Sequence, residues 1–417
     1  MSSTLELIDP VKLAGSKLQV VENRLAACEF CPHRRGIVCH KANDELRQLT
    51  ERAVRLSATC PVDSWKWEEA KRRRVNGNTV VKELNDYPKH DICAVACYFN
   101  PVGWKSLRQN YIRFVRDMKN WDIPLFVAEV AFEDQEFVDP NAFMKLRANR
   151  SHILWQKERL LNELVTRLPA QYTKIAWIDA DVLFLDTHWV ELTCCALDNY
   201  PVVQLWGNWY HSDGNGTLHE CYGSIGHLGN NYMTAGGHPG GAWGAHRSIF
   251  PLYDAHILGG GDSIAIESWV GMTSSFTVDN MEPHFKSHYQ QWSAKAFNKV
   301  RGRVTALPCG ATHLYHGSRT NRRYASRWEI LRDGEYDPKV SIKIDQSPES
   351  FGLYQFANSA SNKLVEAVHG YFTGREEDDA SDRLLPKDWF NPNIQSRIAE
   401  ARSHVIAATT IEVRKDR

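Results

Sequence analysis

The sequence predicts an α/β protein organised around a parallel β-sheet. Short apolar runs typical of strands occupy residues 92–99, 123–132 and 174–178. Helix-like segments stand between them at residues 104–120 and 149–168, and the second has its apolar residues spaced for one helix face. Strands that alternate with helices favour parallel pairing, because each helix returns the chain to the same end of the sheet.

Length and composition indicate a soluble protein of two or three domains. The chain has 417 residues, 43% of them hydrophobic, and its 50 basic residues balance 50 acidic ones. Neither an apolar run of about 18 residues nor the apolar core of a signal peptide is found, so we expect no membrane partner and a cytoplasmic location, in the host cytoplasm if the protein is phage-encoded.

Three regions differ in residue composition and pattern, and these differences predict the domain organisation. Residues 1–90 contain a cysteine cluster, residues 91–335 contain the alternating strands and helices, and residues 336–417 suggest a helical C-terminal extension. That extension includes an acidic run at 376–382, which we interpret as a linker, and helix-like stretches at 361–373 and 393–412. The glycine-rich residues 223–261 are predicted to form loops that let a ligand approach the backbone closely.

Four cysteines in the first region have the spacing of a metal site. They are Cys28, Cys31, Cys39 and Cys60. A close first pair followed by two more thiols fits a tetrahedral zinc site, which would stabilise a module with little core. An iron–sulfur cluster uses the same ligands, and unlinked buried thiols are the plain alternative.

The strongest chemical signal follows the third predicted strand. Asp179 and Asp181 come directly after the apolar run 174–178, where ligands bind in such sheets. Two carboxylates this close are costly to bury without a cation, so Mg²⁺ or Mn²⁺ is the expected partner. The alternative is that one aspartate caps a turn and the other faces solvent.

With this motif, the chain resembles the GT-A class of glycosyltransferases over about residues 91–328. The resemblance implies a Rossmann-like mixed sheet and a metal, held by Asp179 and Asp181, that bridges the diphosphate of a nucleotide-sugar donor. It also implies further contacts to the donor. For Arg150, Lys157 and Asn162, which lie on the predicted helix before the aspartates, the alternative is that they form a solvated polar face. The candidates are Asn100, Pro101, Glu129, Arg150, Lys157, Asn162 and Asp179.

The glycine-rich segment resembles the acceptor half of the same class. Gly240 and Gly241 would lie on a strand beneath the donor sugar, and Asp262 follows a run of three glycines. Asp262 is the candidate general base of an inverting transfer, or a donor-sugar contact if configuration is retained. It could also simply cap the helix that follows, and Glu267 is a second acidic candidate.

A histidine after the glycine-rich segment completes the predicted metal site. His316 resembles the C-terminal metal ligand of GT-A enzymes, and His313 is the competing assignment. Arg319 follows a Gly-Ser turn whose backbone N–H groups could bind phosphate, so it joins the donor-binding candidates. A histidine near a strand end can also be purely structural.

The charge of residues 286–332 bears on the acceptor. This segment contains ten Lys or Arg and one acid, Glu329, with aromatic residues interleaved. For the acceptor, the predicted catalytic domain most resembles the base J glucosyltransferase group. The resemblance is carried by the motifs Tyr98-Phe99-Asn100-Pro101, Trp177-Ile178-Asp179-Ala180-Asp181 and His316-Gly317-Ser318 with Asn321-Arg322-Arg323-Tyr324.

That resemblance implies transfer of glucose from a UDP donor to a hydroxyl, with a 5-hydroxymethylpyrimidine in DNA as the acceptor. One alternative is a glycosyltransferase with a glycan or protein acceptor, in which the cations only hold the donor and cover the surface. Another is a zinc-dependent nucleic-acid-binding protein whose catalytic domain is inactive.

Overall fold

The computed structural model describes residues 89–379, apart from 213–217, 227–236, 319 and 325. It also gives the backbone of two short antiparallel strands, β1 (Arg34–Arg35) and β2 (Val38–Cys39). Two compact units make up the chain, Met1–Glu83 and Leu84–Arg417. Cys28, Cys31 and Cys60 lie outside the described residues and Cys39 is described only by its backbone, so the four-cysteine metal site stays a prediction.

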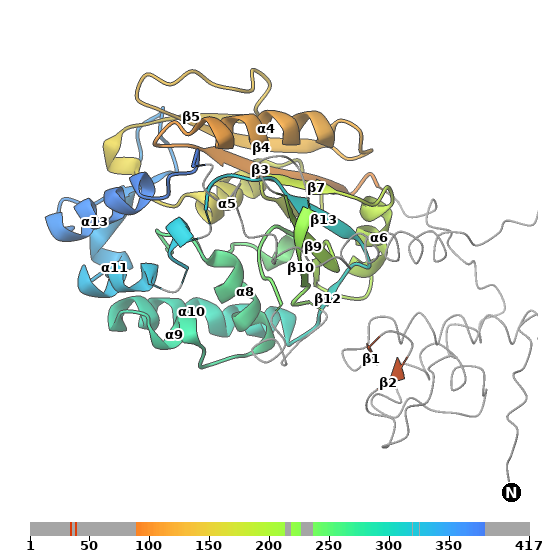
Figure 1. The fold of residues 1–417 in the computed structure, drawn as a ribbon. Helices are drawn as coiled ribbons and strands as arrows, with labels where there is room; N and C mark the ends of the chain where they lie inside the picture. Colours follow the sequence, from red (N-terminus) through yellow and green to blue (C-terminus); the bar gives the residue numbers. More distant parts are fainter. Residues whose placement is uncertain are drawn as a thin grey trace, which may run out of the picture. The chain divides into compact units, whose positions relative to one another are not determined.

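A seven-stranded mixed sheet forms the centre of the second unit (Figure 1). Its order is β12-β8-β11-β6-β3-β4-β5. Every neighbouring pair is parallel except those that β11 makes with β6 and β8. This parallel-rich sheet confirms the predicted α/β class. The strands are β3 (Ile92–Phe99), β4 (Leu125–Phe132), β5 (Met144–Ala148), β6 (Lys174–Ile178), β8 (Val202–Gln204), β11 (Ala242–His246) and β12 (Val304–Ala306).

Helices α4 (Lys105–Met118) and α5 (Lys157–Arg167) cover opposite faces of this sheet (Figure 1). Alternate residues of β3 explain the arrangement, because successive side chains of a strand point to opposite faces. Val95 packs in the apolar cluster that includes Leu160 and Leu164 of α5, whereas Ala94 packs with Phe114 of α4. The sheet is therefore buried on both sides, as parallel sheets usually are.

The predicted helix at 149–168 is wrong over its first two turns. A short 3-10 helix (Arg150–His152), capped by Asn149, comes first, and α5 begins only at Lys157. Between them the backbone N–H of Trp155 donates to the carbonyl oxygen of Ile257 at 2.9 Å. This tertiary hydrogen bond takes the place of the one that Trp155 would make within a helix. Lys157 is therefore the first residue of α5, and the first turn of that helix faces the edge of the sheet.

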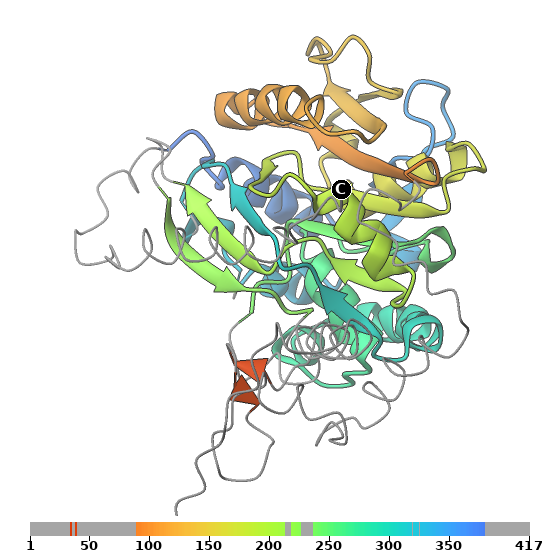
Figure 2. The same ribbon diagram turned by 90° about the vertical axis from the view of Figure 1, so that its right-hand side faces the viewer.

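A second sheet, of order β10-β9-β13-β7, joins two segments that carry candidate ligands (Figure 2). Strand β7 (Val182–Phe184) starts directly after Asp181, and β13 (Gly310–His313) pairs with it so that His313 stands opposite Val182. The backbone N–H of Leu314 donates to the carbonyl oxygen of Asp181 at 2.8 Å. The other two strands are β9 (Asn208–Ser212) and β10 (Leu218–Gly223).

A third apolar cluster includes residues beyond 335. Tyr336, Leu364 and Val368 pack in it with Phe285 and Trp328. Helices α11 and α13 lie together at one side of the second unit in Figure 1, and α9 and α10 lie along its lower side. The remaining elements of the described unit are α6 (Trp189–Leu197), η5 (Arg247–Ile249), α8 (Gly261–Val270), α9 (Phe276–Asp279), α10 (Pro283–Val300), η6 (Thr320–Arg322), α11 (Arg327–Asp333), α12 (Pro338–Ser341), β14 (Ile342–Ile344), β15 (Tyr354–Phe356) and α13 (Asn362–Thr373).

The structure corrects two interpretations of the sequence, one for the glycine-rich segment and one for the acidic run. Within the glycine-rich residues 223–261, β11 pairs on both sides in the sheet, and Gly240 and Gly241, expected to lie on this strand, come directly before it. The described part of the acidic run is not a solvated linker. Glu377 is 1% exposed, and the Asp378 carboxylate accepts hydrogen bonds from the backbone N–H groups of Lys105 and Ser106 at the start of α4.

The described helices do not include one that is both long and apolar enough to cross a membrane.

Candidate active site

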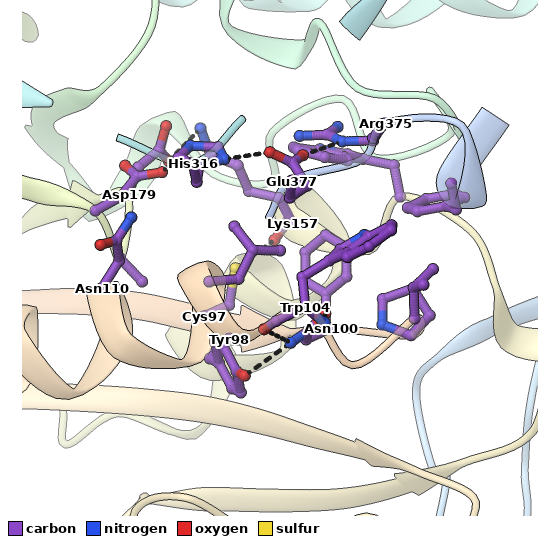
Figure 3. A pocket seen from close by; sticks show the side chains of 18 residues that line it. Cys97, Tyr98, Asn100, Trp104, Asn110, Lys157, Asp179, His316, Arg375 and Glu377 are labelled. Atoms are coloured by element: carbon purple, nitrogen blue, oxygen red, sulfur yellow. Dashed lines mark hydrogen bonds and ion pairs between the residues drawn. The ribbon is translucent and has the colours of Figure 1, made fainter. Parts of the chain in front are cut away.

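A cavity opens at the carboxyl ends of β3 and β6, beside the first turn of α5 (Figure 3). One part of its wall is aromatic and apolar, and the other carries charged groups from four separate segments of the chain. Its polar lining includes Lys157, Asp179, Asp181, His316, Arg375 and Glu377, and its apolar lining includes Tyr98, Phe99, Pro101, Trp104, Leu107, Trp155 and Phe372.

Asp181, His313 and His316 form a group that could hold a metal ion. One ligand atom from each lies within 4.8 Å of the others. Asp181 Oδ2 is 2.8 Å from His316 Nε2 and 3.5 Å from His313 Nε2, and the two histidine nitrogens are 3.1 Å apart. One carboxylate oxygen and two imidazole nitrogens suit a first-row divalent metal such as Mn²⁺. The sequence left His313 and His316 as alternatives, and the structure brings both to Asp181.

The second oxygen of Asp181 supports this fit. Asp181 Oδ1 is buried and has no hydrogen-bond partner among the described residues. Burying an unpaired carboxylate oxygen costs free energy unless a cation or donor reaches it. Burial opposes ionisation here, but the hydrogen bond from His316 and the nearby Arg322 guanidinium lower the pKa of Asp181. The carboxylate is thus kept ionised, as a metal ligand must be.

Asp179 takes a different partner from Asp181. Lys157 Nζ lies 2.6 Å from Asp179 Oδ1 and 2.8 Å from Asp262 Oδ2, so one ammonium group bridges the two carboxylates. Burial lowers the pKa of Lys157, but the two carboxylates outweigh it and raise the pKa well above its ordinary value. Asp179 lies outside the Asp181–histidine group, next to the candidate base Asp262.

Carboxyl groups outnumber the Lys and Arg side chains around the site. Burial raises the pKa of Asp179 to about 7 and that of Glu158 to about 8, although Lys157 opposes both shifts. A divalent cation would relieve the same repulsion that these protons relieve. The surrounding charged groups are five carboxyl groups, Glu158, Asp179, Asp181, Asp262 and Glu377, and three cations, Lys157, Arg322 and Arg375.

Gly240 and Gly241 stand beside these carboxylates. The Gly241 carbonyl oxygen accepts a hydrogen bond from the Asp179 backbone N–H at 2.8 Å. Its φ of +102° and the Trp209 ring, 2.3 Å from where a Cβ would stand, both require glycine. A Cβ on Gly240 would lie 3.8 Å from Asp262 Oδ2. If these two glycines contact the donor sugar as predicted, they do so through backbone that lies next to Asp179 and Asp262.

The helix that carries Asp262 begins directly against a buried carboxyl group. A Cβ on Gly261, the first residue of α8, would lie 2.1 Å from Glu158 Oε1, so no larger residue fits. Negative groups are favourable at a helix N-terminus, because the first N–H groups and the helix dipole present positive charge there. Glu158 and Asp262 therefore lie at the end of α8 that presents positive charge.

Several residues proposed from the sequence have other positions. Asn100 and Pro101 line the cavity, but the Asn100 amide closes its own turn by accepting from the N–H groups of Gly103 and Trp104. Glu129 lies outside the cavity, and its carboxylate accepts from the backbone N–H groups of Val138 and Asp139.

Three further candidates also lie away from the cavity. Arg150 is exposed, and Asn162 binds the backbone of Leu252 and the carboxylate of Asp254 on the far side of α5. Glu267 is buried and accepts from the Ser275 hydroxyl at 2.9 Å. Arg319 is outside the described residues, so its predicted phosphate contact stays a prediction.

The sequence did not single out Glu377, Arg375 or Glu158. Glu377 Oε2 lies 2.5 Å from His316 Nδ1, and Arg375 Nε donates to its other oxygen (Figure 3). In the sequence, Glu377 stands out only as part of an acidic run, and that run was interpreted as a linker. Glu158 is next to Lys157 on α5, where its place in an amphipathic helix gave no indication of burial.

The basic segment 286–332 is partly used inside the fold. Lys299 donates to the backbone carbonyls of residues 248–250, and Arg303 donates to that of Asn199. Arg322 is buried against His316, and Arg327 is buried and donates to the Leu258 carbonyl. These four cations are engaged by the fold, which weakens the argument that the segment as a whole is a path for a polyanion.

Comparisons with known proteins give weak likenesses only. No family model and no curated protein matches the chain. The catalytic domain of Drosophila β1,4-galactosyltransferase 7, in complex with xylobiose, is 14% identical over 42% of this chain, with a TM-score of 0.24. This chain spans 59% of the length of that domain.

Two further structures give similar values. A putative nucleotide-diphospho-sugar transferase from Desulfovibrio desulfuricans is 12% identical over 59% of this chain and 95% of its own, with a TM-score of 0.26. A mutant of the Drosophila enzyme with manganese, UDP-Gal and xylobiose is 13% identical over 64% of this chain and 94% of its own, with a TM-score of 0.27. Superpositions with TM-scores this low do not establish a shared fold, so the function must be argued from the site.

Proposed function

We propose that the described unit is a metal-dependent glycosyltransferase that moves a sugar from a nucleotide-diphosphate donor to a hydroxyl. The observation that carries the proposal is the Asp181–His313–His316 group, with its unpartnered carboxylate oxygen, in a cavity at the carboxyl edge of a parallel-rich sheet. Ligand sites in such sheets lie at this edge. The aromatic wall beside the carboxylates offers a surface for a base and sugar.

The cavity also offers donors for a diphosphate. Arg375 stacks over Trp155, with 5.3 Å between its guanidinium carbon and the ring centroid, and both residues line the cavity. Trp155 Nε1 is buried and has no hydrogen-bond partner among the described residues. A bound phosphate oxygen would satisfy that donor, and guanidinium groups bind phosphate with strong charge-assisted hydrogen bonds.

The proposed reaction gives the metal group and Asp262 separate roles. A divalent cation at the triad supplies charge neutralisation for the departing diphosphate. The acceptor hydroxyl oxygen bonds to the anomeric carbon, the bond from that carbon to the phosphate oxygen breaks, and the nucleoside diphosphate leaves with the electron pair. Asp262 takes the hydroxyl proton if the reaction inverts configuration, and binds the donor sugar if it retains it. Lys157 holds Asp262 and Asp179 in place through its two ion pairs.

The identities of donor and acceptor are proposed from the sequence resemblance. UDP-glucose is the proposed donor, and 5-hydroxymethylpyrimidine in DNA is the proposed acceptor. A glycan or protein acceptor is the competing proposal. The internal use of four cations in 286–332 removes part of the charge argument for DNA. Transfer assays with hydroxymethylated DNA, oligosaccharides and protein substrates in parallel separate these acceptors.

The decisive experiment compares the two aspartates of the motif. Nucleoside diphosphate released from a panel of nucleotide sugars is measured with Mn²⁺ and with EDTA. We expect Asp181→Asn to lower the metal-dependent release by more than about 100-fold, since it removes the carboxylate ligand. Asp333→Asn, at an exposed position, is the matched control.

Asp179→Asn has a separate expected result. It should keep Mn²⁺ affinity within a few-fold of the unaltered protein, because Asp179 is paired with Lys157 and lies outside the triad. Full metal-dependent release by Asp181→Asn, or no release from any nucleotide sugar by the unaltered protein, would show that the proposed function is wrong.

A further inference from the structure

We propose that Glu377 is a positioning residue of the metal site, which orients His316 so that its Nε2 faces the metal position. The inference rests on the proposed metal function. His316 lies between two carboxylates, with Nδ1 2.5 Å from Glu377 Oε2 and Nε2 2.8 Å from Asp181 Oδ2. Figure 3 shows Glu377 between His316 and Arg375, with an interaction on each side.

The hydrogen bond fixes which ring nitrogen carries a proton. An ionised carboxylate can only accept, so His316 Nδ1 must donate to Glu377. Nε2 faces the Asp181 carboxylate and His313, and without a metal it donates to Asp181 by the same argument. A bound metal would take the place of that proton, so Nε2 is the nitrogen that would supply the lone pair. A histidine that donates its other ring N–H to a carboxylate is a stronger ligand, held in one orientation.

Glu377 itself is held from several sides. Its side chain is 1% exposed, Arg375 Nε donates to Oε1, and Arg322 Nη2 lies 3.9 Å from Oε2. These guanidinium groups hold the carboxylate in place and offset its buried negative charge.

The backbone around Glu377 is fixed against the same turn that carries His316. A Cβ on Gly317 would lie 2.7 Å from the Glu377 Cα, so the two segments are in direct contact at a residue with φ of +79°. The Ser106 hydroxyl donates to the Glu377 carbonyl, and the Tyr315 hydroxyl donates to the Asp379 carbonyl, each at 2.7 Å. Residues 374–379 therefore form a strap that belongs to the metal site although Glu377 is 61 residues from His316.

The test measures Mn²⁺ affinity without any nucleotide sugar, from the electron paramagnetic resonance signal of free Mn²⁺. We expect Glu377→Ala to weaken binding by about 10- to 100-fold, the range found for such outer-shell partners. Glu377→Gln keeps the size and an acceptor oxygen but loses the charge, so its affinity should fall between those of Glu377→Ala and the unaltered protein. Glu376→Gln, at the exposed neighbouring position, should leave the affinity unchanged.

A second readout separates orientation from general structural damage. With Co²⁺ in place of Mn²⁺, the visible absorption of the bound ion reports its ligand geometry. That spectrum should change in both Glu377 variants and stay unchanged in Glu376→Gln. If Glu377→Ala fails to fold, Glu377→Gln decides alone.

Three results would overturn the inference. Unaltered Mn²⁺ affinity in the Glu377 variants, while Asp181→Asn loses binding, would overturn it and leave the proposed function intact. An unaltered Co²⁺ spectrum in the Glu377 variants would likewise overturn the orienting role. Absence of Mn²⁺ binding by the unaltered protein would overturn the metal site and this inference together.

Discussion

Replacing Lys157 by Met tests whether one ammonium group holds the carboxylates of the site together. Lys157 is 6% exposed and contacts Asp179 at 2.6 Å and Asp262 at 2.8 Å. Met keeps most of the apolar stem, so the change removes mainly the charge. Removing one partner of a buried ion pair typically costs about 3 to 5 kcal/mol, because the remaining charge is left uncompensated.

The cost should depend on pH in a defined direction. The folded-state pKa of Asp179, about 7, is already above its ordinary value, and loss of Lys157 raises it further. A carboxyl group with a raised folded pKa contributes stability at low pH that is lost as the pH rises through that pKa. We therefore expect a loss of about 3 kcal/mol or more at pH 8 and of about 1 kcal/mol at pH 5, where the folded state already binds protons.

Thermal unfolding in EDTA measures this difference without interference from bound metal. At about 2 °C per kcal/mol for a unit of this size, the melting temperature of Lys157→Met should fall by roughly 6 °C or more at pH 8. Lys363→Met, at an exposed lysine on α13, is the matched control and should change little. An equal loss at pH 5 and pH 8 would refute the reasoning, since it would show that Lys157 stabilises by packing alone.

Three further predictions concern the scaffold around the site. Gly241→Ala should lower the free energy of unfolding by about 2 to 4 kcal/mol, measured by denaturant titration, because a Cβ there would stand 2.3 Å from the Trp209 ring on a backbone with φ of +102°. Burial raises the pKa of Glu267 to about 7, so the free energy of unfolding of the unaltered protein should fall by up to roughly 3 kcal/mol between pH 4.5 and pH 8. Glu267→Gln should not show this fall. If the melting temperatures of both proteins change equally with pH, the prediction is wrong. Asp378→Ala should cost about 1 kcal/mol at neutral pH through the lost cap on α4, with faster amide hydrogen exchange at the first turn of that helix as the local check.

Apolar pattern predicted the central strands well because those strands are buried on both faces. The expected runs at 92–99 and 174–178 coincide with β3 and β6, and the expected strand at 123–132 begins two residues before β4. Strands β7, β8 and β12 have three residues each. A run that short carries no periodicity, so its pairing is decided by tertiary contacts that the local sequence does not show.

The candidate site was predictable where chemistry is local. Asp179 and Asp181 could be located because two carboxylates after an apolar strand are unusual in themselves. Their separate partners could not, since Lys157 reaches Asp179 from α5 and His316 reaches Asp181 from beyond β13. The choice between His313 and His316 likewise depended on the pairing of β13 with β7, which sequence order does not reveal.

The strap at 374–379 changes where the functional unit must end. A chain stopped at residue 335 would keep both aspartates and both histidines, yet it would lose Glu377, which binds His316, and Arg375, which lines the cavity. It would also lose the apolar residues of α13, which share a core with α8 and α10. Because the same strap caps α4 through Asp378, the first helix of the sheet and the last described segment stabilise each other. The proposed metal position thus depends on contacts between the two ends of the described unit, and such contacts form only when both ends have folded together.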